Sequence, residues 1–464
     1  MLNVVFKLLK RIGFSDEFDL AYLFGNYSHE LKHITDERFS GYVLRFLYYF
    51  AFIFKRLIRK SNNKKSSDIL FYAGTINQLN SLDMLIDKVT EKGFTTNLCI
   101  EPNLIPECDK RGLKYFVVKL SFLDLFNILI LNFLRFIYIF QRKKNIYNFS
   151  NVVDKFFIAH VYLVYFEHLF RCCNFDFIVT SNDHNASNRC LIDIAKSYQC
   201  KTFYLQHASV SEYFPKLYTD YALLDGYHAF KVYEKIIEKS KEKCTTKVFL
   251  IGQKKRFNHQ IETVNKPIGL ALNNLDSITH VSELLTTARN ELIPIKIRFH
   301  PSQKKSFKNE LKSRFSEVSI ITFQDTQLES LDDFFYSIRF LIASDTNIHL
   351  EASLAGLFCV YIKFNTLSEY YDYYGFVENN ICIEAYNLLG ANEIYESRIR
   401  DCELRLFSLK QYSETYGSKW FGKEAELFTE VMLNIKENNI NSRGVFKIKP
   451  KESSVCEVYG IYDE

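Results

Sequence analysis

The sequence predicts an α/β protein made of two halves, each built around a parallel sheet. The 464-residue chain is 47% hydrophobic and 24% charged, so it can bury a core, and its length suggests two or three domains. Short apolar segments alternate with helical ones, as in parallel strands joined by crossover helices. Many of these strands stop at polar clusters. Ligands of open α/β sheets lie beyond the carboxyl ends of the strands, so these clusters are the candidate site.

The first α/β domain is predicted over residues 67–240, after an N-terminal helical segment at residues 1–66. That segment ends in a polar run, residues 60–67, which is expected to be a linker. Strands are expected at residues 68–75, 95–100, 175–180, 201–205 and 221–226, and helices at 81–92, 190–198 and 228–239.

The second α/β domain is predicted over residues 247–394, after a polar stretch at 240–247. Two C-terminal helices, 395–410 and 422–438, fill a segment at 395–440 that returns to the first half, and residues 441–464 are expected to be a weakly ordered tail. Within the domain, strands are expected at residues 247–252, 267–272, 294–299, 319–323, 340–343 and 358–362, and helices at 277–291, 331–337 and 348–356.

Two apolar stretches, residues 41–58 and 121–140, raise the question of a membrane contact. A spanning helix needs about 20 largely uncharged residues, but Arg45 interrupts the first stretch, and Asp124 and Arg135 interrupt the second. Both stretches are therefore predicted to be amphipathic helices. Packing against the core is the first expectation. The alternative is a peripheral contact with the inner face of the cytoplasmic membrane, because basic residues flank both apolar faces.

Charge and cysteine content exclude several classes of protein. The net charge is +5, from 59 Lys and Arg against 54 Asp and Glu, and this is too small to indicate nucleic-acid binding. The eleven cysteines are scattered and odd in number, and none has the spacing of a zinc site. We therefore expect a reducing, cytoplasmic setting without a disulfide scaffold. Lys7 and Lys10 interrupt the apolar N-terminus, which argues against a signal peptide.

Three polar clusters end strands of the first domain. Gly74 permits a tight turn and a close ligand approach, but no GxGxxG or Walker loop accompanies it, which argues against dinucleotide enzymes and P-loop kinases. Asp183 and His184 stand together within Ser-Asn-Asp-His-Asn, where they either take a proton from a hydroxyl group or simply cap the next helix. Gln206 and His207 end a neighbouring strand and are expected to lie near them.

Two further clusters end strands of the second domain. Pro301 restricts His300 to an extended conformation, which holds the imidazole at the strand tip, where it can donate to a phosphate oxygen. The run Ser-Asp-Thr-Asn at 344–347 precedes a helix that contains Glu351. A helix N-terminus with hydroxyl groups is an anion site, with helix capping as the alternative, and Glu351 is placed to accept hydrogen bonds from a ribose. The Tyr-rich loop 370–375 is either a platform for a sugar or base, or packing.

In this order, the clusters resemble those of GT-B glycosyltransferases. The resemblance is to bacterial capsule and lipopolysaccharide transferases of the polysialyltransferase-like and CDP-glycerol glycerophosphotransferase-like groups. It rests on His300-Pro301, on the stretch 344–356, and on Gln206-His207-Ala208, where Ala208 stands in place of the family's glycine. It spans about residues 68–380.

The resemblance implies two Rossmann-like domains that face one another across a cleft (the GT-B fold), with extra N-terminal helices. The second domain would bind a nucleotide-activated donor and the first an acceptor. His300 would contact the donor phosphate or act as an acid on it. The other residues implied in donor binding are Pro301, Ser344, Asp345, Thr346, Asn347 and Glu351, and those implied in acceptor binding are Gly74, Asn182, Gln206 and Asp225.

The catalytic base is left open between two aspartates. The sialyltransferase-type base lies in an acidic pair followed by glycine, whereas Leu224-Asp225-Gly226 has only one acid. Asp183 is therefore the first candidate and Asp225 the second, with His184 and His207 as further catalytic candidates. No bound metal or other cofactor is expected, because GT-B enzymes generally need no metal and no DxD motif is present.

The expected activity is sugar transfer from a nucleotide-sugar donor to a growing surface polysaccharide, capsule or lipopolysaccharide. The transfer is expected to invert the anomeric centre without a metal, and the acceptor to be a glycan or lipid-linked glycan. The alternatives are a polyol-phosphate transferase, a nucleotide-sugar 2-epimerase and a non-catalytic polysaccharide assembly factor.

Overall fold

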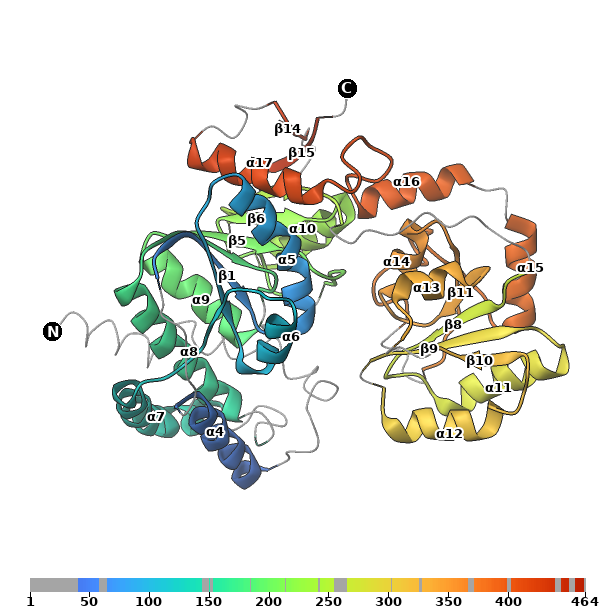
Figure 1. Ribbon diagram of the computed structural model, residues 1–464, viewed down its shortest axis with the longest axis horizontal. Coiled ribbons are helices and arrows are strands. Elements are labelled where there is room, and N and C mark those ends of the chain that lie inside the picture. Colours follow the sequence, from blue (N-terminus) through green and yellow to red (C-terminus); the bar gives the residue numbers. More distant parts are fainter. Residues whose placement is uncertain are drawn as a thin grey trace.

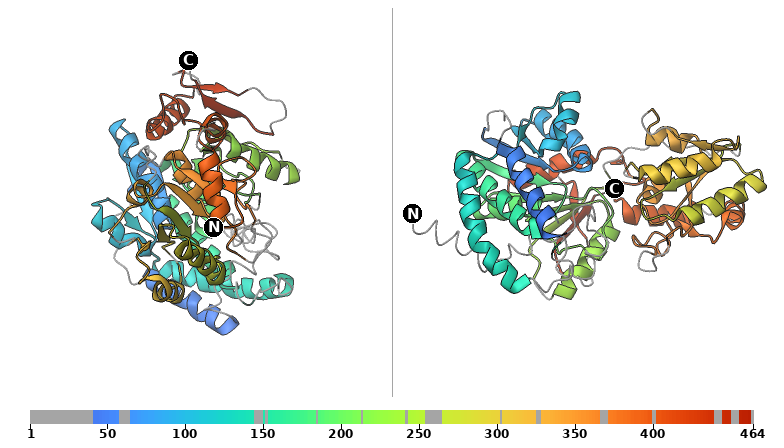
Figure 2. Two further views of the ribbon diagram at one scale, coloured as in Figure 1. Left: turned by 90° about the vertical axis from the view of Figure 1, so that its right-hand side faces the viewer. Right: turned by 90° about the horizontal axis from the view of Figure 1, so that it is seen from below.

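The chain folds into two α/β domains that lie side by side (Figure 1) and remain so when seen from below (Figure 2). The fold is taken from a computed structural model. It describes residues 41–57, 65–143, 150, 153–183, 185–212, 214–240, 243–253, 265–301, 303–324, 328–365, 371–398, 402–438, 444–449 and 455–462.

The first domain contains a nine-stranded sheet in the order β14-β15-β7-β6-β5-β4-β1-β2-β3. All neighbours pair in parallel except β14 and β15, which are antiparallel. The order around β1 is that of a Rossmann fold. The strands are β1 (Ser67–Ala73), β2 (Thr96–Ile100), β3 (Phe116–Val117), β4 (Phe175–Thr180), β5 (Lys201–Leu205), β6 (Tyr221–Leu224), β7 (Lys247–Leu250), β14 (Phe446–Ile448) and β15 (Val458–Ile461).

The second domain repeats this order in a six-stranded parallel sheet, β10-β9-β8-β11-β12-β13. In both sheets the strand order reverses next to the first strand, which creates a crevice at the carboxyl ends. The strands are β8 (Ile268–Leu272), β9 (Ile295–Phe299), β10 (Ile321–Phe323), β11 (Phe340–Ala343), β12 (Phe358–Tyr361) and β13 (Ile383–Glu384).

Helices cover both faces of each sheet. In the first domain they are α4 (Tyr42–Leu57), α5 (Ile76–Glu91), the 3-10 helix η2 (Pro102–Leu104), α6 (Ile105–Lys110), α7 (Phe122–Lys143), α8 (Val153–Cys172), α9 (Ala186–Ser197) and α10 (Tyr227–Ser240). In the second they are α11 (Ile278–Asn290), α12 (Lys305–Phe315), α13 (Leu331–Tyr336), α14 (Ile348–Leu354) and α15 (Leu388–Arg398), followed by α16 (Cys402–Tyr412) and α17 (Glu424–Lys436).

Burial on both faces explains why the strands are continuous apolar runs. Along β1, Leu70 and Tyr72 pack into the core beneath α8 and α9, whereas Ile69 and Phe71 pack into the opposite core beneath α5 and α17. All four side chains are 0% exposed. The alternation follows from the two-residue repeat of a strand.

The end of the chain returns from the second domain to the first. Helix α16 ends against the loop after β6, and α17 packs against α5. Gly226 makes the close approach possible, because a Cβ atom there would lie 2.4 Å from the backbone oxygen of Gln411. Gly252, at φ +79°, fits against Thr415 in the same way. These contacts tie the C-terminal helices to the strand ends of the first domain.

Several sequence expectations are corrected at the domain boundaries. The second domain does not begin at residue 247, because β7 pairs with β6 and β15 in the first sheet. The expected tail at 441–464 contains the β14–β15 hairpin at the edge of that sheet. The expected helix at 395–410 is divided between α15 and α16. Each of these segments is paired or packed against a distant part of the chain, which local patterns do not reveal.

Other sequence expectations concern the two apolar helices near the N-terminus. The helices expected at 41–58 and 121–140 correspond to α4 and α7, whereas residues 1–40 lie outside the described part of the chain. Among the described residues, no helix combines the length and the hydropathy needed to cross a bilayer.

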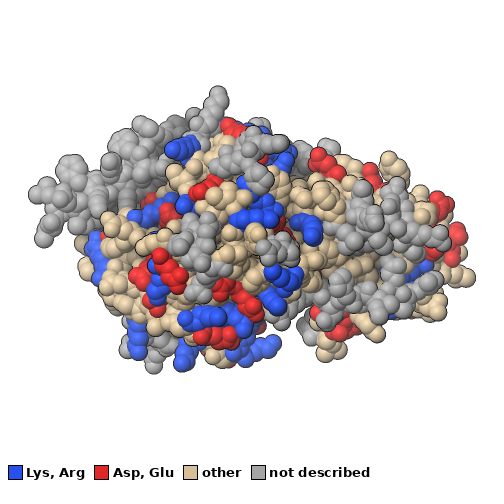
Figure 3. All heavy atoms as spheres, turned by 90° about the horizontal axis from the view of Figure 1, so that it is seen from above, with Lys and Arg blue, Asp and Glu red and all other residues tan. Residues whose placement is uncertain are grey.

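Lys and Arg intermingle with Asp and Glu over the first domain when it is seen from above (Figure 3).

Replacing Gly226 should destabilise the protein. In Gly226→Ala the new methyl group meets backbone atoms of residues 411–413 that cannot rotate away. We expect the free energy of unfolding to fall by about 1–3 kcal/mol, the usual cost of overpacking. Urea unfolding followed by circular dichroism measures it. The control is Gly390→Ala in α15, where the nearest atom lies 3.4 Å from the new Cβ and stability should hold. Equal stability of the two variants would contradict the assigned packing.

Candidate functional site

The carboxyl ends of the two sheets enclose a cavity of about 660 Å³, here called the interdomain cavity. This volume suits a small-molecule ligand. Its first-domain wall consists of Ile76, Asn77, Asn80, Ser81, Gln206, His207, Ala208, Asp225 and Gln253. Its second-domain wall consists of Ala271, Leu272, Arg298, Phe299, His300, Pro301, Leu331, Thr346, Asn347, Ile348 and Glu351.

Gln206 joins two strand ends of the first-domain wall. Its Oε1 accepts a hydrogen bond from the backbone N–H of Asp225 (2.9 Å), and its Nε2 donates to the carbonyl of Ala208 (3.0 Å). Gln206 therefore positions both the loop after β5, which carries His207, and the loop after β6, which carries Asp225. Asp225 is only 5% exposed and is part of this wall.

The first two turns of α5 supply the neutral part of the same wall. The helix begins at the N-cap Thr75, and Asn77, Asn80 and Ser81 line the cavity. Gly74 lies behind this surface, where its N–H donates to Oε1 of Gln78 (2.7 Å). The amide and hydroxyl groups offer both donors and acceptors, as a hydroxyl-rich ligand requires.

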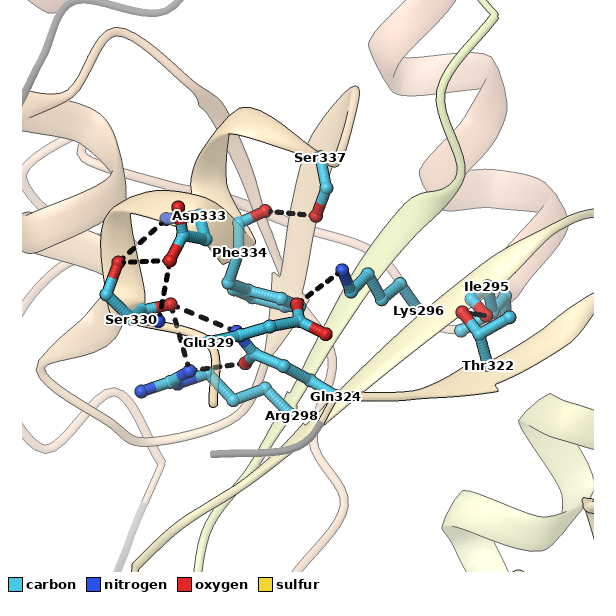
Figure 4. Close-up of polar contacts among 10 residues, drawn as sticks. All are labelled: Ile295, Lys296, Arg298, Thr322, Gln324, Glu329, Ser330, Asp333, Phe334 and Ser337. Carbon is cyan, nitrogen blue, oxygen red and sulfur yellow. Dashed lines mark hydrogen bonds and ion pairs between the residues drawn. The ribbon is translucent and has the colours of Figure 1, made fainter. Parts of the chain in front are cut away.

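Arg298 brings a cation to the second-domain wall (Figure 4). Its Nη1 donates to Oε1 of Gln324 and to the carbonyl of Ser330, and Gln324 also donates to that carbonyl (3.0 Å). Burial lowers the pKa of Arg298, while the nearby carboxylates of Glu351 and Glu329 oppose this effect. The guanidinium group remains charged. It is thus held in one place at the cavity wall.

His300 lies at the tip of the same strand. Its backbone N–H donates to the carbonyl of Leu272 (3.0 Å), and its carbonyl accepts from the N–H of Gln303 (3.0 Å). Burial, aided by the charge of Lys308, lowers the pKa of the imidazole. His300 is therefore neutral near pH 7, with one ring nitrogen as a donor and the other as an acceptor.

The segment before α14 divides into residues that line the cavity and residues that support it. Thr346, Asn347 and Glu351 line the wall. Ser344 is fully buried and bonds instead to Asp276 and Asn273.

Asp345 is also a supporting residue. It accepts hydrogen bonds from the hydroxyl of Tyr361 (2.8 Å) and the backbone N–H of Tyr373 (2.9 Å). Asp345 thus holds part of the Tyr-rich loop, and neither Asp345 nor Ser344 lines the cavity.

The cluster after β4 lies apart from the lining of the cavity. Asp183 is 3% exposed; burial raises the pKa values of Tyr204 and Tyr233, and the charge of Asp183 raises them further. The Oδ1 of Asn182 accepts a hydrogen bond from the N–H of Asn185 (2.8 Å), the N-cap residue of α9. His184 lies outside the described residues.

The structure thus brings together a subset of the sequence candidates. The residues that meet in the lining are Gln206, His207, Asp225, His300, Pro301, Thr346, Asn347 and Glu351. Those that lie outside the lining are Gly74, Asn182, Asp183, Ser344 and Asp345.

Sequence analysis did not select Asn77, Asn80, Ser81, Gln253 and Arg298. Arg298 carried a usable signal, because it precedes His300 by two residues on one strand and therefore shares its face.

The two domains also contact each other at the edge of the cavity. Ser209, in the loop after β5, donates to Oδ1 of Asn347, and the hydroxyl of Ser211 donates to that of Tyr373 (2.9 Å). No group of three or more His, Cys, Asp or Glu residues is arranged to hold a metal ion in the part of the chain that is described.

Comparison with solved structures shows the fold. A UDP-N-acetylglucosamine 2-epimerase matches with a TM-score of 0.51 and 11% identity, over 83% of this chain and 99% of its own. S. aureus MnaA, in a structure with UDP, matches with a TM-score of 0.50 and 12% identity, over 82% and 98%. The glycotransferase of kitacinnamycin matches with a TM-score of 0.50 and 10% identity, over 78% and 98%.

The chain therefore has the GT-B fold, as predicted. No protein-family model matches the chain, and no curated protein matches its sequence.

A buried histidine behind the second-domain wall should make stability depend on pH. His349 is fully buried in α14, with its Nε2 3.0 Å from the carbonyl of Ser344. Burial lowers its pKa from 6.5 to about 4. The unfolded chain therefore takes up this proton first, so unfolding becomes easier as the pH falls through this window. The contribution of this one group should be a loss of about 3 kcal/mol between pH 6.5 and about pH 4.

The variant His349→Gln tests this prediction, because glutamine retains a donor but does not titrate. Its unfolding free energy, measured in urea at several pH values, should fall less steeply over the same window. An unchanged slope would assign the acid sensitivity to other groups.

Proposed function

We propose that this protein is a glycosyltransferase that moves a sugar from a nucleotide-activated donor to a hydroxyl group of an acceptor. The proposal is carried by one observation: the interdomain cavity places the charged Arg298 and the neutral His300 on one wall, opposite a wall of amides, His207 and Asp225. In a nucleotide-sugar donor, an anionic phosphate or diphosphate joins the nucleoside to the sugar. The fixed cation of one wall suits this phosphate, and the polar groups of the other wall suit the hydroxyl groups of the sugar.

The second-domain wall suits the donor nucleotide. Arg298 is charged and fixed, so it can form charge-assisted hydrogen bonds to phosphate oxygens. Neutral His300 donates a further hydrogen bond, and the hydroxyl of Thr346 adds another donor. Glu351, also on this wall, accepts hydrogen bonds from the ribose hydroxyls. These contacts stabilise the negative charge that grows on the phosphate as the sugar leaves.

The first-domain wall suits the sugar and the acceptor. Asp225 removes the proton of the acceptor hydroxyl while the oxygen of that hydroxyl attacks the anomeric carbon of the donor sugar. The bond from that carbon to the phosphate oxygen breaks, and the nucleotide leaves with the electron pair. Attack from the face opposite the leaving group inverts the configuration. Asp225 is preferred to Asp183 because only Asp225 lines the cavity.

The cellular role that we propose is synthesis of a surface polysaccharide, capsule or lipopolysaccharide, in the cytoplasm and without a metal. The support is the sequence resemblance at His300-Pro301 and residues 344–356, together with Arg298, which supplies a positive charge for the leaving group. A polyol-phosphate transferase would use the same donor wall.

A nucleotide-sugar 2-epimerase is the second candidate, and the structural similarity to a UDP-N-acetylglucosamine 2-epimerase favours it. Both activities need a nucleotide-sugar in the cavity, but an epimerase converts the sugar without any acceptor. Incubation with the donor alone separates them, because an epimerase forms a new nucleotide-sugar whereas a transferase without acceptor at most releases free nucleotide.

The proposed function first predicts nucleotide binding. A thermal-shift screen with CMP, CDP, UDP, GDP and their sugar conjugates should show stabilisation by one nucleotide class, through mass action on the native state. The shift should persist in EDTA. Arg298→Ala and His300→Ala should each weaken this binding about tenfold or more, because a hydrogen bond to a charged group is lost.

The matched control is Lys296→Ala. Lys296 lies on the same strand and pairs with Glu329 (2.7 Å) outside the cavity lining, so its loss should leave nucleotide binding unchanged. Stabilisation by none of the nucleotides would reject the donor site and favour the non-catalytic assembly factor.

The proposed function also predicts that removal of the general base slows the reaction. Asp225→Asn should lower the turnover of the donor identified in the screen about 10²–10⁴-fold, the usual contribution of a general base. The dissociation constant of the donor should change little, because Asp225 lies on the opposite wall. Product release measured by chromatography gives turnover, and calorimetry gives the dissociation constant.

Asp183→Asn is the companion variant and should keep near-normal turnover if it folds. The reverse outcome, with Asp225→Asn active and Asp183→Asn inactive but able to bind the donor, would return the role of base to Asp183.

A further inference from the structure

Helix α4 has an inverted arrangement of polar and apolar residues. Arg45 and Arg56 face the protein, at 5% and 6% exposure, and form ion pairs with Asp154 and Glu101. The apolar residues on the opposite side face outward. Val43, Leu47, Phe50 and Phe54, spaced as one helical stripe, are 74%, 59%, 53% and 63% exposed.

Helix α7 lies beside α4 and has the same inversion. Asp124 and Asn132 turn inward, where Asp124 accepts hydrogen bonds from Ser121 and Asn132 contacts Tyr49 of α4. The outward stripe is again apolar. Phe122, Phe126, Ile130 and Phe133 are 83%, 62%, 46% and 71% exposed.

The outward stripes of these two helices, which Asn132 and Tyr49 join, are here called the α4–α7 face; both helices lie at the lower left of the first domain in Figure 1. Half of the exposed large apolar side chains in the described part of the chain belong to these two helices. A helix that faced only water would show the opposite arrangement, since exposed apolar surface of this extent marks an interaction site.

The charges around the face indicate what covers it. Helix α4 contains no acidic residue, and Asp124, the only acid of α7, is turned inward. Lys55 is exposed near the end of α4, Arg59 and Lys60 follow it in the sequence, and α7 ends in Arg-Lys. An apolar face with basic flanks and without exposed acids complements an anionic lipid surface. A second copy of the same face would set these cations against one another.

We propose that the α4–α7 face docks the protein on an anionic bilayer, with both helices lying in the interface. This inference stands on the surface alone and does not require the proposed transfer reaction. If that reaction is correct, docking has a consequence for the acceptor. Arg56 connects the end of α4 to Glu101 at the carboxyl end of β2, the sheet edge that also borders the interdomain cavity. A lipid-linked acceptor would therefore reach the first-domain wall from this side.

Flotation of the full chain with lipid vesicles tests the proposal. The protein should float with vesicles of phosphatidylcholine and phosphatidylglycerol, and less with phosphatidylcholine alone. The double variant Phe54→Glu and Phe126→Glu should reduce the bound fraction about tenfold or more, because two phenyl groups that enter the bilayer on docking are lost. The matched control is Tyr386→Glu with Phe407→Glu, at 91% and 67% exposure outside the face, which should float like the wild type.

Nucleotide-induced stabilisation, measured on the same variants, separates this proposal from the proposed function. It should be equal in the wild type and in the face variant, which also shows that the variant is folded. Two results would overturn docking: a wild type that stays in the soluble fraction with both kinds of vesicle, or a face variant that floats like the wild type. A wild-type dimer that only the face variant dissociates, with no vesicle binding, would assign the face to self-association instead.

Discussion

The parallel pairing of strands around β1 and β8 is the constraint on which the rest of the structure depends. In a parallel sheet all carboxyl ends lie at one edge, so the loops that follow them meet there whatever their distance in sequence. The loops carrying His207, Asp225 and Gln253 follow neighbouring strands of the first sheet, and those carrying His300 and Thr346 follow strands of the second. Because the two edges face one another, these loops and the start of α5 line one cavity.

The relative position of the two domains depends on the C-terminal helices, which lead the chain from the second domain back to the first. Helices α16 and α17 pack on the first domain after the second is complete, and the close contact at Gly226 leaves no room for a side chain. The same loop carries Asp225, so one packing contact positions both the domain connection and a carboxylate of the cavity. Ser209 and Ser211, in the loop after β5, add two hydrogen bonds to the second domain.

Charged and neutral side chains are distributed over the molecule in a way that agrees with the proposed reaction. In the described lining, the fixed guanidinium group lies on the second-domain wall and the amides lie mainly on the first. On the outer surface, the arginines of α4 turn inward and its phenyl rings turn outward. Both arrangements cost folding energy unless a ligand or a surface compensates, since exposed apolar area and a partly buried cation are each unfavourable alone.

The sequence by itself determined the α/β class, most strands and the strand-end clusters, because alternating apolar runs and polar stops are local patterns. It also placed Gln206, His207, His300 and Glu351 in the candidate site. Only the tertiary structure assigned β7, β14 and β15 to the first sheet. It also placed Asp183 outside the cavity lining, added Arg298 and the start of α5 to the wall, and showed which face of α4 points outward. These outcomes depend on which strands pair and which helices pack together. The segments involved lie far apart in sequence, so a local sequence pattern does not predict these contacts.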